Sequence, residues 1–148
     1  MKIIICGAGQ VGSQIARHLA GEDNDVTIVD QDGGLVRRVT EAFDVGGVTG
    51  FASHPDILAQ AGAEDADMLI AATFADEVNR VACQVAHSLF SVPQKIARIR
   101  AQTYRKVETE LFNRDQLPID VVISPEFEVA RTALRRLRNP EAFELEDF

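Results

Sequence analysis

Three glycines and one aspartate near the start of the chain have the spacing that binding of a diphosphate requires. Gly7, Gly9 and Gly12 form the pattern G-x-G-x-x-G directly after the apolar run 2–6, and Asp30 ends the next apolar run. In such a unit the first glycine permits a tight turn, the second lets backbone approach a pyrophosphate, and the third lets a helix pack close to a strand. The N-terminus of that helix attracts the anion, and the acid accepts hydrogen bonds from ribose hydroxyls. The pattern therefore predicts a dinucleotide site.

The aspartate also indicates which nucleotide fits. A carboxylate at Asp30 accepts a hydrogen bond from a free 2′-hydroxyl and disfavours a 2′-phosphate, so NAD or an adenine nucleotide is expected rather than NADP. Capping of the following helix is an alternative task for Asp30, although Asp32 suits that cap better. If Asp30 only binds ligand, Asp30→Ala should abolish stabilisation by nucleotide and leave the melting temperature of the free protein nearly unchanged.

Short apolar runs alternate with helical patterns along the chain, which predicts βαβ units and a parallel sheet. Strands are expected at 2–6, 25–30, 45–49, 67–72, 95–100 and 119–123, and helices at 10–21, 33–43, 54–61, 75–90, 104–113 and 125–138. Six strands fit an α/β Rossmann fold, doubly wound in the order 3-2-1-4-5-6, with helices on both faces. The pairs Gly33-Gly34 and Gly46-Gly47 weaken the start of the second helix and the third strand.

Ligands of this fold bind beyond the carboxyl ends of the strands, where the strand order reverses. Thr73 and Phe74 follow the fourth expected strand, and Arg98 lies on the fifth. Thr73 is also expected to cap the next helix. Arg98 has two alternatives: contact with a phosphate or carboxylate of the ligand, or a surface ion pair.

Composition excludes several classes of protein. The chain has 148 residues, 46% hydrophobic residues and a formal net charge of −8, as expected of one acidic globular domain. An acidic protein gains nothing from counterion release, so no nucleic-acid partner is expected. No stretch suits a membrane span or a signal peptide, so a cytoplasmic location without direct membrane insertion is expected.

Cys6 and Cys83 are expected to be small core residues, with a redox-sensing role as the alternative.

No catalytic pattern accompanies the nucleotide motif. The sequence has no P-loop, no paired Cys/His metal spacing and no Ser/His/Asp order, so no catalytic or metal residues are assigned. His54 is the only histidine near an expected strand end, and it occupies the first turn of a helix. The main alternative is an NAD-dependent oxidoreductase fragment that lacks its substrate domain. A redox-sensing repressor would need a DNA-binding element, which the charge disfavours.

Several segments together resemble the TrkA family, the cytosolic nucleotide-binding subunits of bacterial Trk potassium-uptake systems, and specifically its N-terminal KTN/RCK domain. The segments are 2–12, 26–30, 52–56 (A-S-H-P-D), 65–73 (D-A-D-M-L-I-A-A-T) and 97–100. The resemblance runs from Met1 to about Asn139.

The resemblance implies a regulator rather than an enzyme. Such domains bind NAD(H) or ATP/ADP, form homodimers that assemble into rings, and gate a membrane potassium-transporting subunit from the inner face of the cell membrane. It implies ligand contacts by the turn, the acid, the fourth strand end and the fifth strand: Gly7, Ala8, Gly9, Gln10, Val11, Asp30, Thr73, Phe74 and Arg98, with Gly12 packing beneath the turn. It also implies that 125–138 crosses to a partner subunit. The nucleotide-binding domain is assigned to 1–139, and 140–148 is expected to be an acidic tail truncated from a longer chain.

Overall fold

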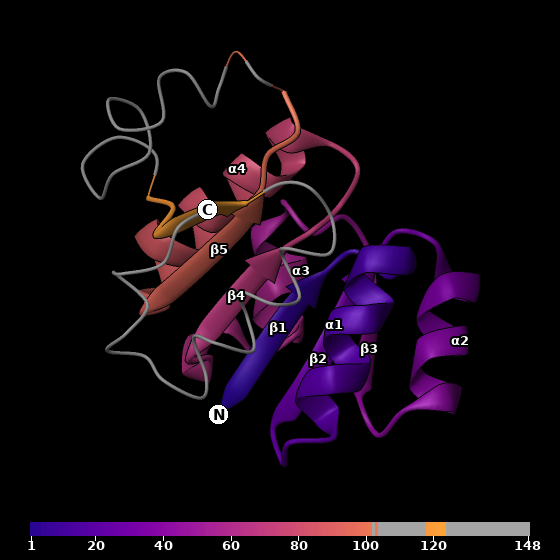
Figure 1. Cartoon of the computed structure of the whole chain (residues 1–148). Helices are drawn as coiled ribbons and strands as arrows, with labels where there is room; N and C mark the ends of the chain where they lie inside the picture. The colour runs from indigo at the N-terminus through magenta and orange to yellow at the C-terminus, as the bar shows by residue number, and fades with distance from the viewer. Residues whose placement is uncertain (102, 104–117, 124–148) are drawn as a thin grey trace.

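The computed structural model of the chain describes residues 1–101, 103 and 118–123 (Figure 1). Three predicted segments lie outside these residues: the helices at 104–113 and 125–138, and the tail at 140–148. All helices and strands below belong to the described part of the chain.

The strands form one six-stranded sheet in the order β3-β2-β1-β4-β5-β6, as predicted. Every neighbouring pair is parallel, so the carboxyl ends of the strands meet at one edge (Figure 1). The strands are β1 (Lys2–Cys6), β2 (Asp25–Asp30), β3 (Gly46–Thr49), β4 (Met68–Ala71), β5 (Gln94–Arg98) and β6 (Val121–Ile123).

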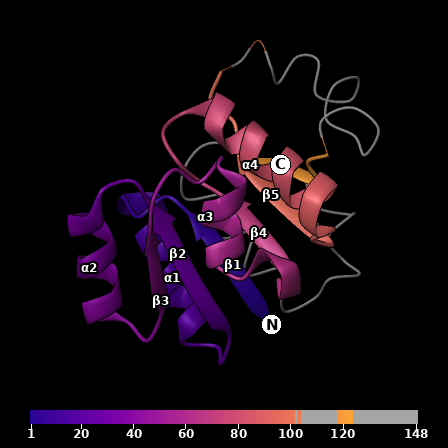
Figure 2. The ribbon, with the colours of Figure 1, turned by 180° about the vertical axis from the view of Figure 1, so that it is seen from behind.

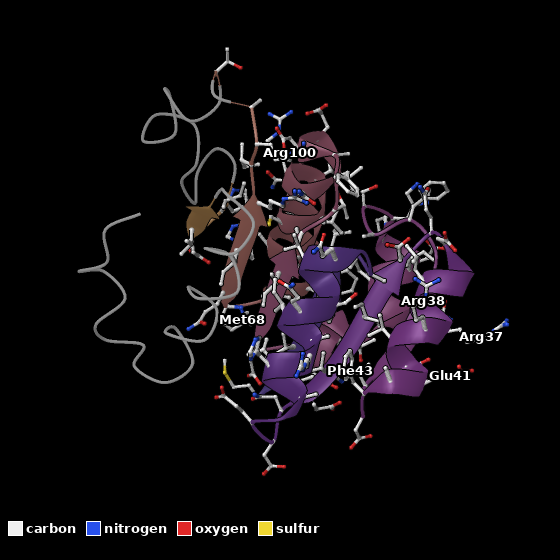
Figure 3. All side chains as sticks on the ribbon, turned by 45° about the vertical axis from the view of Figure 1, so that its right-hand side comes forward. Arg37, Arg38, Glu41, Phe43, Met68 and Arg100 are labelled. Atoms are coloured by element: carbon white, nitrogen blue, oxygen red, sulfur yellow. The ribbon has the colours of Figure 1, made fainter. Side chains whose placement is uncertain are left out.

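Helices cover both faces of the sheet, as expected of a doubly wound fold. They are α1 (Gln10–Ala20), α2 (Gly33–Ala42), α3 (Pro55–Gln60) and α4 (Asp76–Phe90), with a 3₁₀ turn, η1, at Ala63–Asp65. Figures 1 and 2 show α1 and α2 on one face and α3 and α4 on the other. Arg37, Arg38 and Glu41 project from the outer side of α2 (Figure 3). No helix in the described part of the chain is long and apolar enough to cross a membrane.

Strand β1 is apolar on both sides because it lies between two cores. Ile3 and Ile5 pack into the core beneath α1 and α2, whereas Ile4 and Cys6 pack into the core beneath α3 and α4. All four side chains are fully buried. A parallel strand covered on both faces has a continuous apolar sequence. Because β1 lies in the interior of the sheet, it places the glycine turn near the centre of the sheet edge.

The two glycine pairs do not disrupt the elements that contain them. The N-cap Asp32 supports the start of α2, since its carboxylate accepts hydrogen bonds from the N–H groups of Gly34 and Leu35. Gly47 lies in β3 where α2 packs close: a Cβ there would lie 2.5 Å from Cγ1 of Val36 and 2.7 Å from Cγ2 of Thr40. Helix packing explains this glycine, which strand propensity alone does not.

Strand β5 ends two residues earlier than predicted, at Arg98. The carboxylate of Asp76 accepts hydrogen bonds from the N–H groups of Arg100 and Ala101, at 2.9 and 2.8 Å. Those two N–H groups bond to α4 rather than to a neighbouring strand, and the chain leaves the sheet there.

Candidate functional site

A cavity of about 400 Å³ opens at the carboxyl edge of the sheet. Its lining comes from the glycine turn and from the ends of β2, β3, β4 and β5. Eight of the ten residues predicted for the site line it: Gly7, Gly9, Gln10, Val11, Asp30, Thr73, Phe74 and Arg98. The other two, Ala8 and Gly12, are buried behind the turn and do not line the cavity.

Each glycine of the motif meets a different steric requirement. Gly7 has φ +108° and would place a Cβ 2.8 Å from the carbonyl oxygen of Ala72. A Cβ on Gly12 would overlap the carbonyl oxygen of Gly7, so α1 can approach the turn only without a side chain there. At Gly9 the nearest atom is Cε2 of Phe74 at 4.0 Å, which leaves that side of the backbone open to a ligand.

The N-terminus of α1 faces the cavity without a side-chain cap. Gly9 is the N-cap residue and makes no side-chain hydrogen bond, and the first two helical residues, Gln10 and Val11, line the cavity. Unpaired N–H groups and the helix dipole at such a terminus favour an anion. This end of the cavity is therefore suited to a phosphate group.

Asp30 joins β2 to the glycine turn. Its Oδ2 accepts the N–H of Ala8 at 2.7 Å, and its Oδ1 accepts the N–H of Asp32 at 2.8 Å. A carboxylate has about four lone-pair positions, so these two bonds leave acceptor capacity for hydroxyl groups in the cavity. The cap of α2 is Asp32 and not Asp30, in agreement with the preferred sequence assignment.

Thr73 does not cap α4 as predicted. The N-cap of α4 is Ala75, with no side-chain hydrogen bond to the helix. The hydroxyl of Thr73 instead lies 2.7 Å from Oδ1 of Asn79 and accepts the N–H of Ala75 at 3.2 Å. The partner that redirects Thr73 is a buried side chain six residues along the chain, which a local capping pattern does not reveal.

Phe74 and Arg98 line one side of the cavity, and Arg100 lies beside the Phe74 ring. Phe74 is 72% exposed. The guanidinium carbon atoms of Arg98 and Arg100 lie 5.4 and 5.6 Å from the centre of its ring, within cation–π range. Arg98 is only 3% exposed, so its side chain is largely withdrawn from solvent. Figure 3 shows Arg100 beyond the end of β5, near the start of α4.

Sequence reasoning missed Phe51. This residue lines the cavity after β3, is 54% exposed, and lies 5.1 Å from the ring of His54 between ring centres. An exposed aromatic ring beside a cavity is suited to stacking on a planar base. The sequence feature that could have identified Phe51 as a site residue is its position, two residues after the predicted end of the third strand. His54 itself is not part of the cavity lining.

Neither thiol belongs to the site. Burial raises the pKa of Cys6 to about 12. Burial also raises the pKa of Cys83 well above its usual 9.0, and the neighbouring Cys6 adds to that rise. Among the described residues no group of three or more His, Cys, Asp or Glu side chains is arranged to hold a metal ion.

The sequence closely matches curated proteins. The Trk system potassium uptake protein TrkA of Azorhizobium caulinodans is 59% identical over 149 residues, and that of Halomonas elongata is 51% identical over 148 residues. Both matches cover 100% of this chain and 32% of the relative. The chain thus spans about a third of the length of these relatives.

Solved structures share the fold. The TrkA-N domain of the inner membrane protein ybaL from Escherichia coli has a TM-score of 0.72 and 25% identity, with 92% of this chain and 96% of that one covered. A Shewanella denitrificans Kef CTD in AMP-bound form has a TM-score of 0.71 and 22% identity, covering 98% and 90%. A GsuK channel bound to NAD has a TM-score of 0.68 and 18% identity, covering 82% and 21%. The TrkA-N domain model matches residues 3–125, most of the chain, and the chain therefore belongs to the TrkA-N domain family.

Proposed function

We propose that this chain is a nucleotide-binding regulatory domain that gates a membrane potassium transporter and catalyses no reaction. The observation that carries the proposal is the pairing of two features in one cavity: an uncapped helix N-terminus at Gly9 and the carboxylate of Asp30. The first is suited to a pyrophosphate, and the second to a ribose. The names of the curated relatives, which are potassium uptake proteins, support the transporter partner.

NAD(H) is the proposed ligand, with ATP or ADP as the alternative. Asp30 and Asp32 both line the cavity, and two carboxylates at the ribose end repel a 2′-phosphate. The exposed ring of Phe51 offers a stacking surface for adenine beside them. The bound states of two fold neighbours, one with NAD and one with AMP, are compatible with either ligand.

A regulator works by binding one conformation more tightly than another. The ligand can shift a conformational equilibrium only by its difference in affinity for the two states. Within the whole protein we propose a homodimer that assembles into a ring below the transporter, on the cytoplasmic side of the membrane. Contacts of this domain with its copies would then carry the effect of the nucleotide to the pore.

Thermal unfolding with a set of nucleotides tests the proposal. Melting temperatures are measured with NAD⁺, NADH, NADPH, ATP, ADP and buffer alone. A ligand at 100 times its dissociation constant stabilises the native state by about 2.7 kcal/mol. NAD⁺ and NADH should raise the melting temperature, and NADPH should not. Absence of any nucleotide effect contradicts the proposal, and hydride transfer to a panel of small alcohols and acids would favour an oxidoreductase.

The variant Gly9→Asp tests nucleotide binding without lowering the stability of the fold. Gly9 has φ −76°, and a Cβ there meets no atom closer than 4.0 Å, so the side chain is tolerated. An aspartate at the N-cap stabilises a helix by a few tenths of a kcal/mol relative to glycine. The variant should therefore melt at or slightly above the wild-type temperature while losing the shift with NAD⁺, because its carboxylate occupies and repels the phosphate position. Arg37→Ala, on the outer side of α2 (Figure 3), is the control and should keep the shift.

A further inference from the structure

The side chain of Asn79, in the first turns of α4, is fully buried behind the cavity. Its Oδ1 accepts the N–H of Thr73 at 2.9 Å and the hydroxyl of Thr73 at 2.7 Å. Its Nδ2 donates to the carbonyl oxygens of Thr73 at 3.1 Å and Arg98 at 2.7 Å. The carboxamide therefore spans the end of β4 and the end of β5.

Every hydrogen-bonding position of this carboxamide is used. An asparagine side chain offers two acceptor lone pairs and two N–H donors, and the four bonds match them one to one. An aspartate of the same shape lacks both donors, and a leucine lacks all four groups. Because the site is buried, any partner left without a bond is penalised, which makes the arrangement rigid.

The residues that Asn79 joins form one wall of the cavity. Thr73 and Arg98 both line it, and Phe74 lies next to Thr73 with its ring against the Arg98 guanidinium. Asp76, one turn earlier on α4, bonds to the backbone of Arg100 and so fixes the chain just beyond this wall. The start of α4 therefore sets the spacing between the two strand ends.

We propose that Asn79 is a positioning residue that holds Thr73, Phe74 and Arg98 opposite the glycine turn. The inference rests on the proposed function and assigns the two halves of the ligand to different parts of the site. β2, which carries Asp30, lies on one side of β1, whereas β4 and β5 lie on the other. In a doubly wound fold a dinucleotide lies across the point where the strand order reverses. With the adenylate half at the turn and Asp30, the wall held by Asn79 would contact the half beyond the pyrophosphate.

Calorimetric titration of the whole chain with NAD⁺ and, separately, with AMP tests this division. In Asn79→Ala the dissociation constant for NAD⁺ should rise about tenfold or more, as expected when a supporting residue is lost. The constant for AMP should change by less than about twofold, because its contacts are elsewhere. Leu58→Ala is the matched control: Leu58 is fully buried in the core beneath α3 and α4, does not line the cavity, and should lower the melting temperature while leaving both constants unchanged.

Each outcome supports or overturns the proposal. An equal loss of NAD⁺ and AMP binding in Asn79→Ala, or no loss of either, overturns the role of Asn79 and leaves the proposed function intact. Failure of the wild-type chain to bind either ligand overturns the proposed function as well. If Asn79→Ala does not fold, Asn79→Ser decides, because serine is uncharged, keeps one polar group beside Thr73 and removes the amide donor to the Arg98 carbonyl. It should show the same selective loss of NAD⁺.

Discussion

Asp30 holds the glycine turn in place in addition to facing the cavity. One carboxylate oxygen bonds to the N–H of Ala8 and the other to the N–H of Asp32, so a single side chain ties the first strand–helix turn to the end of β2. A ligand that bonds to the same carboxylate would bind a group that is already fixed in direction. This is preorganisation, which limits the entropy lost on binding.

Replacing Asp30 should therefore weaken the fold as well as the site. Asp30→Ala removes the acceptor from two backbone donors, and we expect the free energy of unfolding to fall by about 1–3 kcal/mol in urea denaturation without ligand. This revises the expectation, from sequence alone, of a nearly unchanged melt. Asp25→Ala, at the exposed start of the same strand, is the control and should change stability by less than about 0.5 kcal/mol. Equal stability of Asp30→Ala and wild type would mean that the two bonds contribute nothing.

Single residues differ in how far their roles could be predicted from sequence. Gly7 and Gly12 were predictable because their tasks follow from spacing along one local unit. The role of Thr73 was not, because its hydroxyl bonds to the buried carboxamide of Asn79, a contact that a local capping pattern does not reveal. Phe51 was missed because an aromatic residue in a loop has no periodic pattern to mark it.

At the level of helices and strands, order was more predictable than boundaries. Strand order followed from the alternation of apolar runs and amphipathic segments, which the parallel sheet confirms. The end of β5 depended on the carboxylate of Asp76, which lies on another element and competes for the N–H groups of the chain beyond Arg98. Such long-range competition is absent from any local sequence window.

The packing of α2 against β3 provides a test at this level. Gly47→Ala places a methyl group 2.5 Å from Cγ1 of Val36 and 2.7 Å from Cγ2 of Thr40, and both neighbours are β-branched and stiff. We expect a loss of about 1–3 kcal/mol in the free energy of unfolding, as in other overpacked sites. Gly46→Ala is a close control, since its Cβ would approach no atom nearer than 3.4 Å. If Gly47→Ala loses no more stability than Gly46→Ala, the close approach of α2 does not explain Gly47.

The whole molecule places both of its thiols in one core, between the sheet and the helices α3 and α4. Cys6 ends β1 and Cys83 lies in α4, and both are fully buried. In that position the charged thiolate is disfavoured, so the pKa of Cys6 rises to about 12 and that of Cys83 rises well above 9.0. Burial of this kind makes a thiol unreactive in the native state.

These shifts make global stability depend on alkaline pH. Above pH 9.0 the unfolded chain releases the thiol protons, whereas the native chain retains that of Cys6 up to about pH 12. The native state then binds more protons than the unfolded state, so the free energy of unfolding falls as pH rises, by about 1.4 kcal/mol per pH unit for each thiol. Urea denaturation of the wild type and of the double variant Cys6→Ala/Cys83→Ala at pH 8, 9 and 10 measures the difference. The double variant should lose stability less steeply above pH 9.0, and the two slopes should coincide below it. Parallel slopes across the whole range would show that the thiols ionise alike in the folded and unfolded chain, which is incompatible with two cysteines enclosed between the sheet and its helices.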